Sequence, residues 1–255
     1  MSIRLEQKDA ALIIHNQEAR RGAIQPELYE AIKAAMQNAE APAIRTVILT
    51  GGPFFCAGGD LTQLRQRASL PEDERRARIE QLHDVIRAMH ACPVPLIAAI
   101  EGGAAGAGLS FALACDLIVA AENATFTAAY VKVGLTPDGG LTSALSRLLP
   151  RQLAMEACLF GTPISAETLN NLGGITRLCR KGQALAEAET LARRIAEGPR
   201  QAQSQICALL RSAADQPLDV QMAREVESMA QAVASPEAAE GMAAFCEKRP
   251  PVFRS

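Results

Sequence analysis

Three glycine-rich segments carry the residues that could do chemistry, and each lies between a predicted strand and a predicted helix. The first contains Ala57, Gly58, Gly59, Asp60 and Leu61. Small residues let backbone N–H groups approach a ligand closely, and the first N–H groups of a helix have no acceptor within it. This segment therefore predicts either a site for a negatively charged oxygen or a tight turn with Asp60 as the helix N-cap.

The second and third segments offer a further donor and a carboxylate. Residues 101–116 lack the GxGxxG spacing of a dinucleotide-binding turn, because Phe111 stands where the third glycine would fall. This segment could pack tightly on a sheet, or it could direct a second N–H at the same ligand and complete an oxyanion hole. In residues 134–142, Asp138 precedes a predicted helix and is either an N-cap or a general base.

The composition of the 255-residue chain argues against several other chemistries. The three histidines (His15, His83, His90) show no metal-ligand spacing, so no metal site is expected. Seven cysteines without a CxxC motif indicate a reducing, cytoplasmic location. The net charge of -2 gives no basic patch for nucleic acid. We also expect no membrane span and no export signal, because no uninterrupted run of about 18 apolar residues occurs.

The elements that must position these segments follow an α/β pattern. Short apolar runs predict strands at residues 11–15, 46–50, 96–100, 117–120 and 175–179. A 3.6-residue apolar period predicts a helix over residues 26–40, and the second segment continues helically to about residue 115. After residue 150 helices dominate, at residues 183–197, 199–213, 218–234 and 236–245. Repeated strand-turn-helix cycles are typical of an α/β fold.

Four motifs, in order along the chain, resemble those of the crotonase (enoyl-CoA hydratase/isomerase) superfamily. They are FCAGGDL at 55–61, AGAGL at 105–109, KVGLTPDGG at 132–140 and FCEKRPPVF at 245–253. The resemblance implies a ββα spiral core over residues 1–197 and a C-terminal helical trimerisation region over residues 198–255. It also implies a homotrimer or homohexamer. The expected partner is an acyl-CoA thioester, with coenzyme A as part of the substrate and no separate cofactor.

The resemblance also assigns site residues. The thioester oxygen would lie between the backbone N–H groups of Ala57 and Ala107, with Asp138 as the catalytic carboxylate. Lys248 would reach the substrate across a subunit boundary. The remaining substrate or CoA contacts implied are Arg20, Gly58, Gly59, Asp60, Leu61, Gly108 and Tyr130, with His83 and Ser110 as secondary candidates.

The reaction depends on where this sequence departs from the family. Ser110 and Tyr130 stand where the family's hydratases carry two glutamates, so ordinary hydration is disfavoured. A single carboxylate at position 138 resembles the isomerase branch, which includes the ring-epoxide (1,2-epoxyphenylacetyl-CoA) isomerase. We therefore expect an isomerase that shifts a double bond or rearranges a ring-derived acyl-CoA. Three alternatives stay open: an atypical hydratase, a hydrolytic dehalogenase using Asp138 and His83, and a non-catalytic acyl-CoA-binding subunit.

Overall fold

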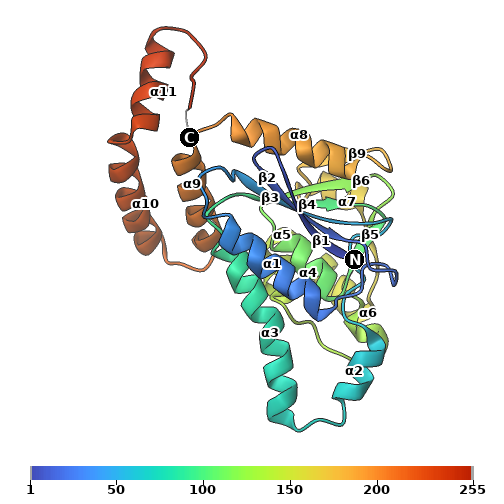
Figure 1. Cartoon of the computed structure of the whole chain (residues 1–255). Helices are drawn as coiled ribbons and strands as arrows, with labels where there is room; N and C mark the ends of the chain where they lie inside the picture. Colours follow the sequence, from blue (N-terminus) through green and yellow to red (C-terminus); the bar gives the residue numbers. More distant parts are fainter. Residues whose placement is uncertain (1, 254–255) are drawn as a thin grey trace.

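The computed structural model describes residues 2–253, and a six-stranded β-sheet lies at its centre (Figure 1). The strand order is β1-β2-β3-β4-β6-β9. Only the β1–β2 pair is antiparallel, and the other neighbours run parallel. The strands are β1 (Ile3–Lys8), β2 (Ala11–Asn16), β3 (Thr46–Gly51), β4 (Leu96–Ile100), β6 (Leu117–Ala121) and β9 (Arg177–Cys179).

The side chains of the central strands alternate between two hydrophobic cores. In β3, Val47 and Leu49 enter one core, whereas Ile48 enters the other with Ile97 of β4. Helix α8 (Ala184–Ala196) covers the second core through its buried alanines, and α1 (Pro26–Asn38) and α3 (Glu72–His90) cover the first (Figure 1). Burial on both faces explains why these strands read as continuous apolar runs.

The predicted strand and helix ranges agree with the structure to within two residues at most ends, but no range is predicted for the longest helix, α3, or for α6 (Arg151–Phe160). Strand β1 was not predicted, nor was a small sheet of β5 (Gly103–Ala105), β7 (Thr125–Thr127) and β8 (Ile164–Ser165). Two- and three-residue strands leave no periodic signal. The remaining elements are α2 (Leu61–Arg67), α4 (Ala107–Leu113), the 3-10 helix η1 (Ala129–Val133), α5 (Leu141–Leu148) and α7 (Ala166–Asn171).

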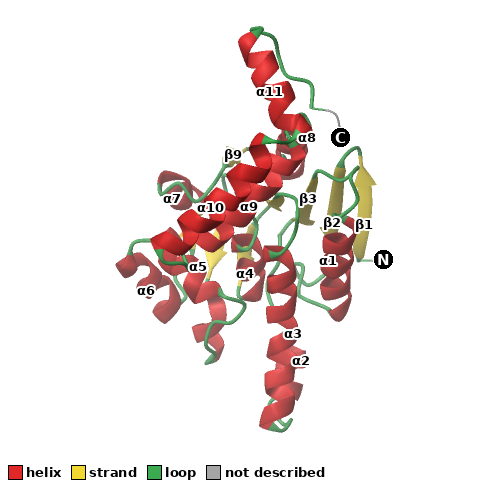
Figure 2. Ribbon diagram, turned by 90° about the vertical axis from the view of Figure 1, so that its left-hand side faces the viewer, coloured by secondary structure: helices red, strands yellow, loops and turns green. Residues whose placement is uncertain are grey.

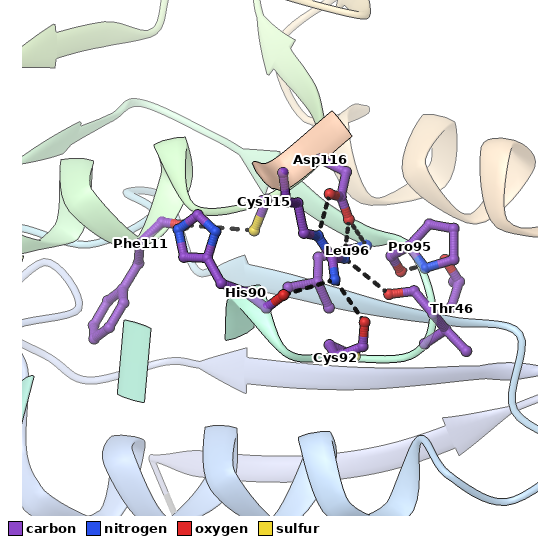
Figure 3. A network of polar contacts seen from close by, with 10 residues as sticks. Thr46, His90, Cys92, Pro95, Leu96, Phe111, Cys115 and Asp116 are labelled. Atoms are coloured by element: carbon purple, nitrogen blue, oxygen red, sulfur yellow. Dashed lines mark hydrogen bonds and ion pairs between the residues drawn. The ribbon is translucent and has the colours of Figure 1, made fainter. Parts of the chain in front are cut away.

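The C-terminal helices form an arm at one end of the molecule, and α2 with the start of α3 forms a projection at the other (Figure 2). The arm consists of α9 (Arg200–Ala213), α10 (Leu218–Val233) and α11 (Pro236–Cys246). Arg211 of α9 joins it to the sheet by hydrogen bonds to both carboxylate oxygens of Asp116, and Asp116 is labelled in Figure 3. No helix within residues 2–253 is long and apolar enough to span a membrane.

Candidate active site

The loops that follow β3 and β4 are joined by backbone hydrogen bonds. The Phe55 amide donates to the carbonyls of Glu101 and Gly103, both at 3.0 Å, and the Ala105 amide donates to the Cys56 carbonyl at 2.9 Å. Gly108 of α4 lies so close to this strand-like contact that an added Cβ would be 2.3 Å from the Cys56 carbonyl oxygen. The chain therefore needs glycine at position 108, and the first loop runs along the N-terminal end of α4.

The backbone amides of Gly59 and Ala107 are among those at this junction that have no hydrogen-bond acceptor within residues 2–253. Ala107 begins α4, where amides have no intrahelical partner. Gly58, next to Gly59, has φ +85°, and a Cβ there would be 3.1 Å from the Ala107 nitrogen. The two free donors thus belong to loops that touch each other.

The structure corrects one predicted donor. The Ala57 amide donates to the Arg21 carbonyl at 3.0 Å and is therefore not free to bind a ligand oxygen. The turn before α1 supplies this acceptor, and a Cβ on Gly22 would lie 2.8 Å from the Phe55 carbonyl oxygen. The predicted donor Ala57 is therefore wrong, and Gly59 offers a free amide in the same loop.

The third loop brings Asp138 together with Tyr130 and Ser110. The Tyr130 hydroxyl donates to Oδ1 of Asp138 at 2.6 Å, and the Ser110 hydroxyl donates to the Asp138 backbone carbonyl at 3.0 Å. The N-cap of α5 is Gly140, so the possible N-cap role of Asp138 is wrong. Its carboxylate is partly buried and accepts from a phenol rather than from helix amides.

The two hydroxyls beside Asp138 are buried and neutral. Burial raises the pKa of Tyr130, and the charge of Asp138 and the hydrogen bond to it raise it further. The Tyr130 side chain therefore remains a donor at every physiological pH. Burial also raises the pKa of the Cys56 thiol to about 12, so this cysteine in the first loop is not a nucleophile.

Asp60 has the structural role that one of the two readings gave it. It is the N-cap of α2, accepting from the Thr62 amide at 2.7 Å, and this hydrogen bond, followed by the charge of Arg20, lowers its pKa. Arg20 donates to Asp60 at 2.6 Å, while two thirds of the Arg20 side chain is exposed (66%). Leu61 begins α2 and is exposed. Arg20 thus presents an accessible cation beside the first loop.

Among the described residues, His83 and Lys248 make no hydrogen bond to Asp138. His83 lies 3.3 Å from Glu80 on its own helix, measured between Nδ1 and Oε2, and a Cβ on Gly139 would lie 3.2 Å from the side chain of the adjacent Leu82. Lys248 follows α11, which lies at the opposite end of the molecule from α2 (Figures 1 and 2). A single chain therefore does not bring Lys248 to the three loops.

Sequence reasoning missed that both tyrosines of the chain lie near Asp138. The ring of Tyr29 in α1 packs edge-on against Phe111, with 6.3 Å between centroids. Burial raises the Tyr29 pKa to about 12, with Arg67 opposing and Asp138 adding to the shift. Its hydroxyl has no hydrogen-bond partner within residues 2–253. No local pattern indicates this proximity, because it arises from the packing of α1 against α4.

A separate cavity of about 1030 Å³ lies between the core and the C-terminal arm. Neither Asp138 nor Tyr130 lines it; its walls include Ser110, Gly139, His90, Asp116, Arg147 and Arg211. Among the described residues, no group of three or more His, Cys, Asp or Glu side chains could hold a metal ion. Hydrogen bonds bring the Tyr130 and Ser110 hydroxyls to Asp138, and the Gly59 and Ala107 amides belong to the two loops joined at the start of α4.

Comparison with known proteins gives consistent matches over the whole length. The family model described as "Enoyl-CoA hydratase/isomerase" matches residues 7–255. The chain is 34% identical over 236 residues to a Rhodobacter capsulatus protein named "Probable enoyl-CoA hydratase", covering 89% of this chain and 91% of that protein. It is 32% identical over 250 residues to the 1,2-epoxyphenylacetyl-CoA isomerase of Escherichia coli, covering 97% and 95%. The crystal structure of an enoyl-CoA hydratase from Polaromonas sp. JS666 matches with a TM-score of 0.95 and 40% identity over 99% of both chains.

Proposed function

The chain belongs to the enoyl-CoA hydratase/isomerase family, and we propose that within this family it is an acyl-CoA isomerase that transfers a proton through Asp138. The predicted α/β crotonase fold with C-terminal helices is confirmed. Family membership makes an acyl-CoA the substrate class. The finer assignment depends on the groups around the reacting carbons.

The observation that carries the proposal is the set of groups in contact with the Asp138 carboxylate in the third loop. Asp138 has hydroxyl-bearing neighbours, Ser110 and Tyr130, and no second carboxylate contacts it among the described residues. Addition of water to a double bond needs an acid and a base around one water molecule, whereas one group can take a proton from one carbon and return it to another. The arrangement therefore favours isomerisation.

In the proposed reaction, the thioester oxygen accepts hydrogen bonds from the Gly59 and Ala107 amides. Asp138 removes a proton from C2 of a 3-enoyl-CoA, the electron pair moves into a dienolate, and the amides stabilise the charge on oxygen. Asp138 then returns the proton to C4, which gives the 2-enoyl-CoA without gain or loss of atoms. Removal of one such donor typically costs about 2.7–4 kcal/mol of transition-state stabilisation.

The direct test follows conjugation of a 3-enoyl-CoA by ultraviolet absorbance. We expect turnover by the native protein and a loss of at least about 10²-fold in kcat for Asp138→Ala, because the variant has no base. Asp84→Asn on the exposed face of α3 is a matched carboxylate control and should keep native kcat. Full activity of Asp138→Ala would refute the assignment.

Hydration is the second candidate, because hydratase names predominate among the relatives. It predicts loss of absorbance when a 2-enoyl-CoA is supplied and uptake of oxygen-18 from labelled water. A hydrolytic dehalogenase using Asp138 and His83 would also take up oxygen-18, but among the described residues His83 contacts Glu80 and makes no hydrogen bond to Asp138. Acyl-CoA binding without turnover on any of these substrates would instead indicate a non-catalytic subunit.

We also propose that the protein assembles as a homotrimer or homohexamer through its C-terminal helices. The arm exposes large apolar side chains that a monomer would leave in water; they include Leu210, Leu218, Val226, Met229 and Phe245. Assembly could bring Lys248 of one chain toward the CoA of another, where Arg20 offers a second cation. Light scattering after size exclusion tests the assembly, and a monomer at micromolar concentration would refute it.

A further inference from the structure

Tyr130 and Asp138 are the two ends of a loop that is closed by their own side chains. The Tyr130 hydroxyl donates to Oδ1 of Asp138 at 2.6 Å. The loop is also closed by the backbone, since the Leu135 amide donates to the Tyr130 carbonyl at 3.0 Å and Gly134 adopts φ +71°. The contact is therefore a local, preformed unit rather than a long-range encounter.

The surroundings of this loop hold both ends in place. Tyr130 is only 8% exposed. On the other side, the Ser110 hydroxyl donates to the Asp138 carbonyl, and a Cβ on Gly139 would lie 2.8 Å from Cβ of Ser110. With the backbone of residue 138 fixed by α4, rotation of the carboxylate about its own side-chain bonds is the remaining freedom, and the phenol restricts it.

A base that moves a proton between two carbons depends on such restriction. Misplacement of a reacting group by about 1 Å can cost about 10²-fold in rate. A carboxylate oxygen that already accepts a hydrogen bond is the less basic of the pair, so an abstracted proton resides preferentially on the other oxygen. That oxygen must then both take and return the proton.

We propose that Tyr130 is the positioning residue for proton transfer, holding Oδ1 of Asp138 so that Oδ2 alone faces the substrate. The inference rests on the proposed function of Asp138 as the base. The C2–H bond breaks as the Oδ2–H bond forms, and the same proton forms the C4–H bond. Transfer consequently takes place on one face of the substrate, with little exchange of the proton with water.

The test compares Tyr130→Phe with Tyr29→Phe, since these are the only two tyrosines in the sequence. Tyr29 is a matched control because its hydroxyl has no hydrogen-bond partner within residues 2–253. The substrate is a 3-enoyl-CoA carrying two deuterium atoms on C2, and mass spectrometry measures the deuterium carried to C4. We expect Tyr130→Phe to lower kcat by about 10- to 100-fold with KM within twofold, and to lower the deuterium carried to C4. Tyr29→Phe should change these three values less than Tyr130→Phe does, because among the described residues the Tyr29 hydroxyl makes no hydrogen bond to Asp138.

The outcomes separate this inference from the proposed function. An inactive Asp138→Ala alongside a Tyr130→Phe with native kcat and native deuterium transfer overturns the positioning role alone. An equal loss in both tyrosine variants also overturns it. Full activity of Asp138→Ala on the same substrate overturns the proposed function and, with it, the role of Tyr130.

A second measurement keeps the test valid if Phe at position 130 lowers the stability. In the Tyr29→Phe background, incorporation of 3-fluorotyrosine labels only position 130. Its fluorine-19 resonance should shift when Asp138 is replaced by Asn, because the carboxylate acceptor is lost. An unchanged resonance in a folded Asp138→Asn protein contradicts the hydrogen bond on which the inference depends.

Discussion

Replacement of Asp116 by Asn should weaken the attachment of the C-terminal arm to the core. Asp116 receives two hydrogen bonds from the Arg211 guanidinium, at 2.8 and 2.6 Å, and one from the Leu96 amide at 2.7 Å. Figure 3 shows Asp116 beside Leu96, the first residue of β4. An asparagine keeps the shape of the side chain but replaces one of the two acceptor oxygens by an NH₂ group, which cannot accept a hydrogen bond from Arg211 or Leu96.

The magnitude follows from the burial of the pair. The side chains of Arg211 and Asp116 are only 10% and 16% exposed. Burial by itself would lower the pKa of the Arg211 guanidinium. The hydrogen bonds to Asp116 and the charge of Asp116 outweigh this effect, so the pKa is raised. Loss of one partner from a buried ion pair costs about 3–5 kcal/mol. Arg211 keeps the carbonyls of His90, Cys92 and Val94 as acceptors, so we expect about 2–3 kcal/mol.

The assays are urea unfolding, which gives the free energy of unfolding, and thermal unfolding, both followed by circular dichroism at one fixed protein concentration. A loss of this size should lower Tm by about 4–12 °C. Glu72→Gln is the matched control, because Glu72 pairs with Arg76 on the surface of α3, and exposed pairs contribute about 0–1 kcal/mol. A cycle with Arg211→Met should give a coupling energy of about 1–3 kcal/mol. An effect of Asp116→Asn no larger than that of Glu72→Gln would refute this reasoning.

Three further changes have defined outcomes. Gly58→Ala should lower kcat by about 10²-fold, because its Cβ would press on the Ala107 amide. Gly52→Ala, with no atom within 4 Å of its Cβ, should have native kinetics. Equal kinetics of the two variants would contradict the role of this junction. Ser235→Ala should lower the free energy of unfolding in urea by about 1 kcal/mol, because the Ser235 side chain caps α11. Ser146→Ala on the surface of α5 is the control. Equal effects of the two changes would show that the cap is unimportant. Burial raises the pKa of both tyrosines, that of Tyr29 to about 12, so absorbance at about 295 nm should show no tyrosinate at pH 10 in the folded protein. The unfolded chain ionises first, so stability should fall as the pH rises from about 10 to 12, and half-ionisation of the folded protein at pH 10 would contradict this burial.

The sheet and its helices could be predicted from the sequence because they depend on local patterns. The run at 96–100 is the observed β4, and the helix predicted from Pro26 begins there. Asp60 caps a helix because its side chain reaches an amide two residues away. Strand β1 is only partly buried and shows no such continuous apolar run, and the small second sheet is too short to leave a pattern.

The chemistry was predictable only in part. The sequence by itself determined that positions 110 and 130 lack carboxylates and that Asp138 lies in the third glycine-rich loop. Residue types are sufficient for that statement. The proposal of an isomerase over a two-carboxylate hydratase depends on these residues.

Only the tertiary structure decided which backbone amides are free and how Asp138 is held. The Ala57 amide is used by the Arg21 carbonyl, which reaches it from the turn before α1, whereas Gly59 offers a free amide in the same loop. Ser110 reaches the Asp138 carbonyl across the contact of α4 with the third loop. Hydrogen bonds between segments far apart in sequence depend on packing, and residue types and spacing do not specify them.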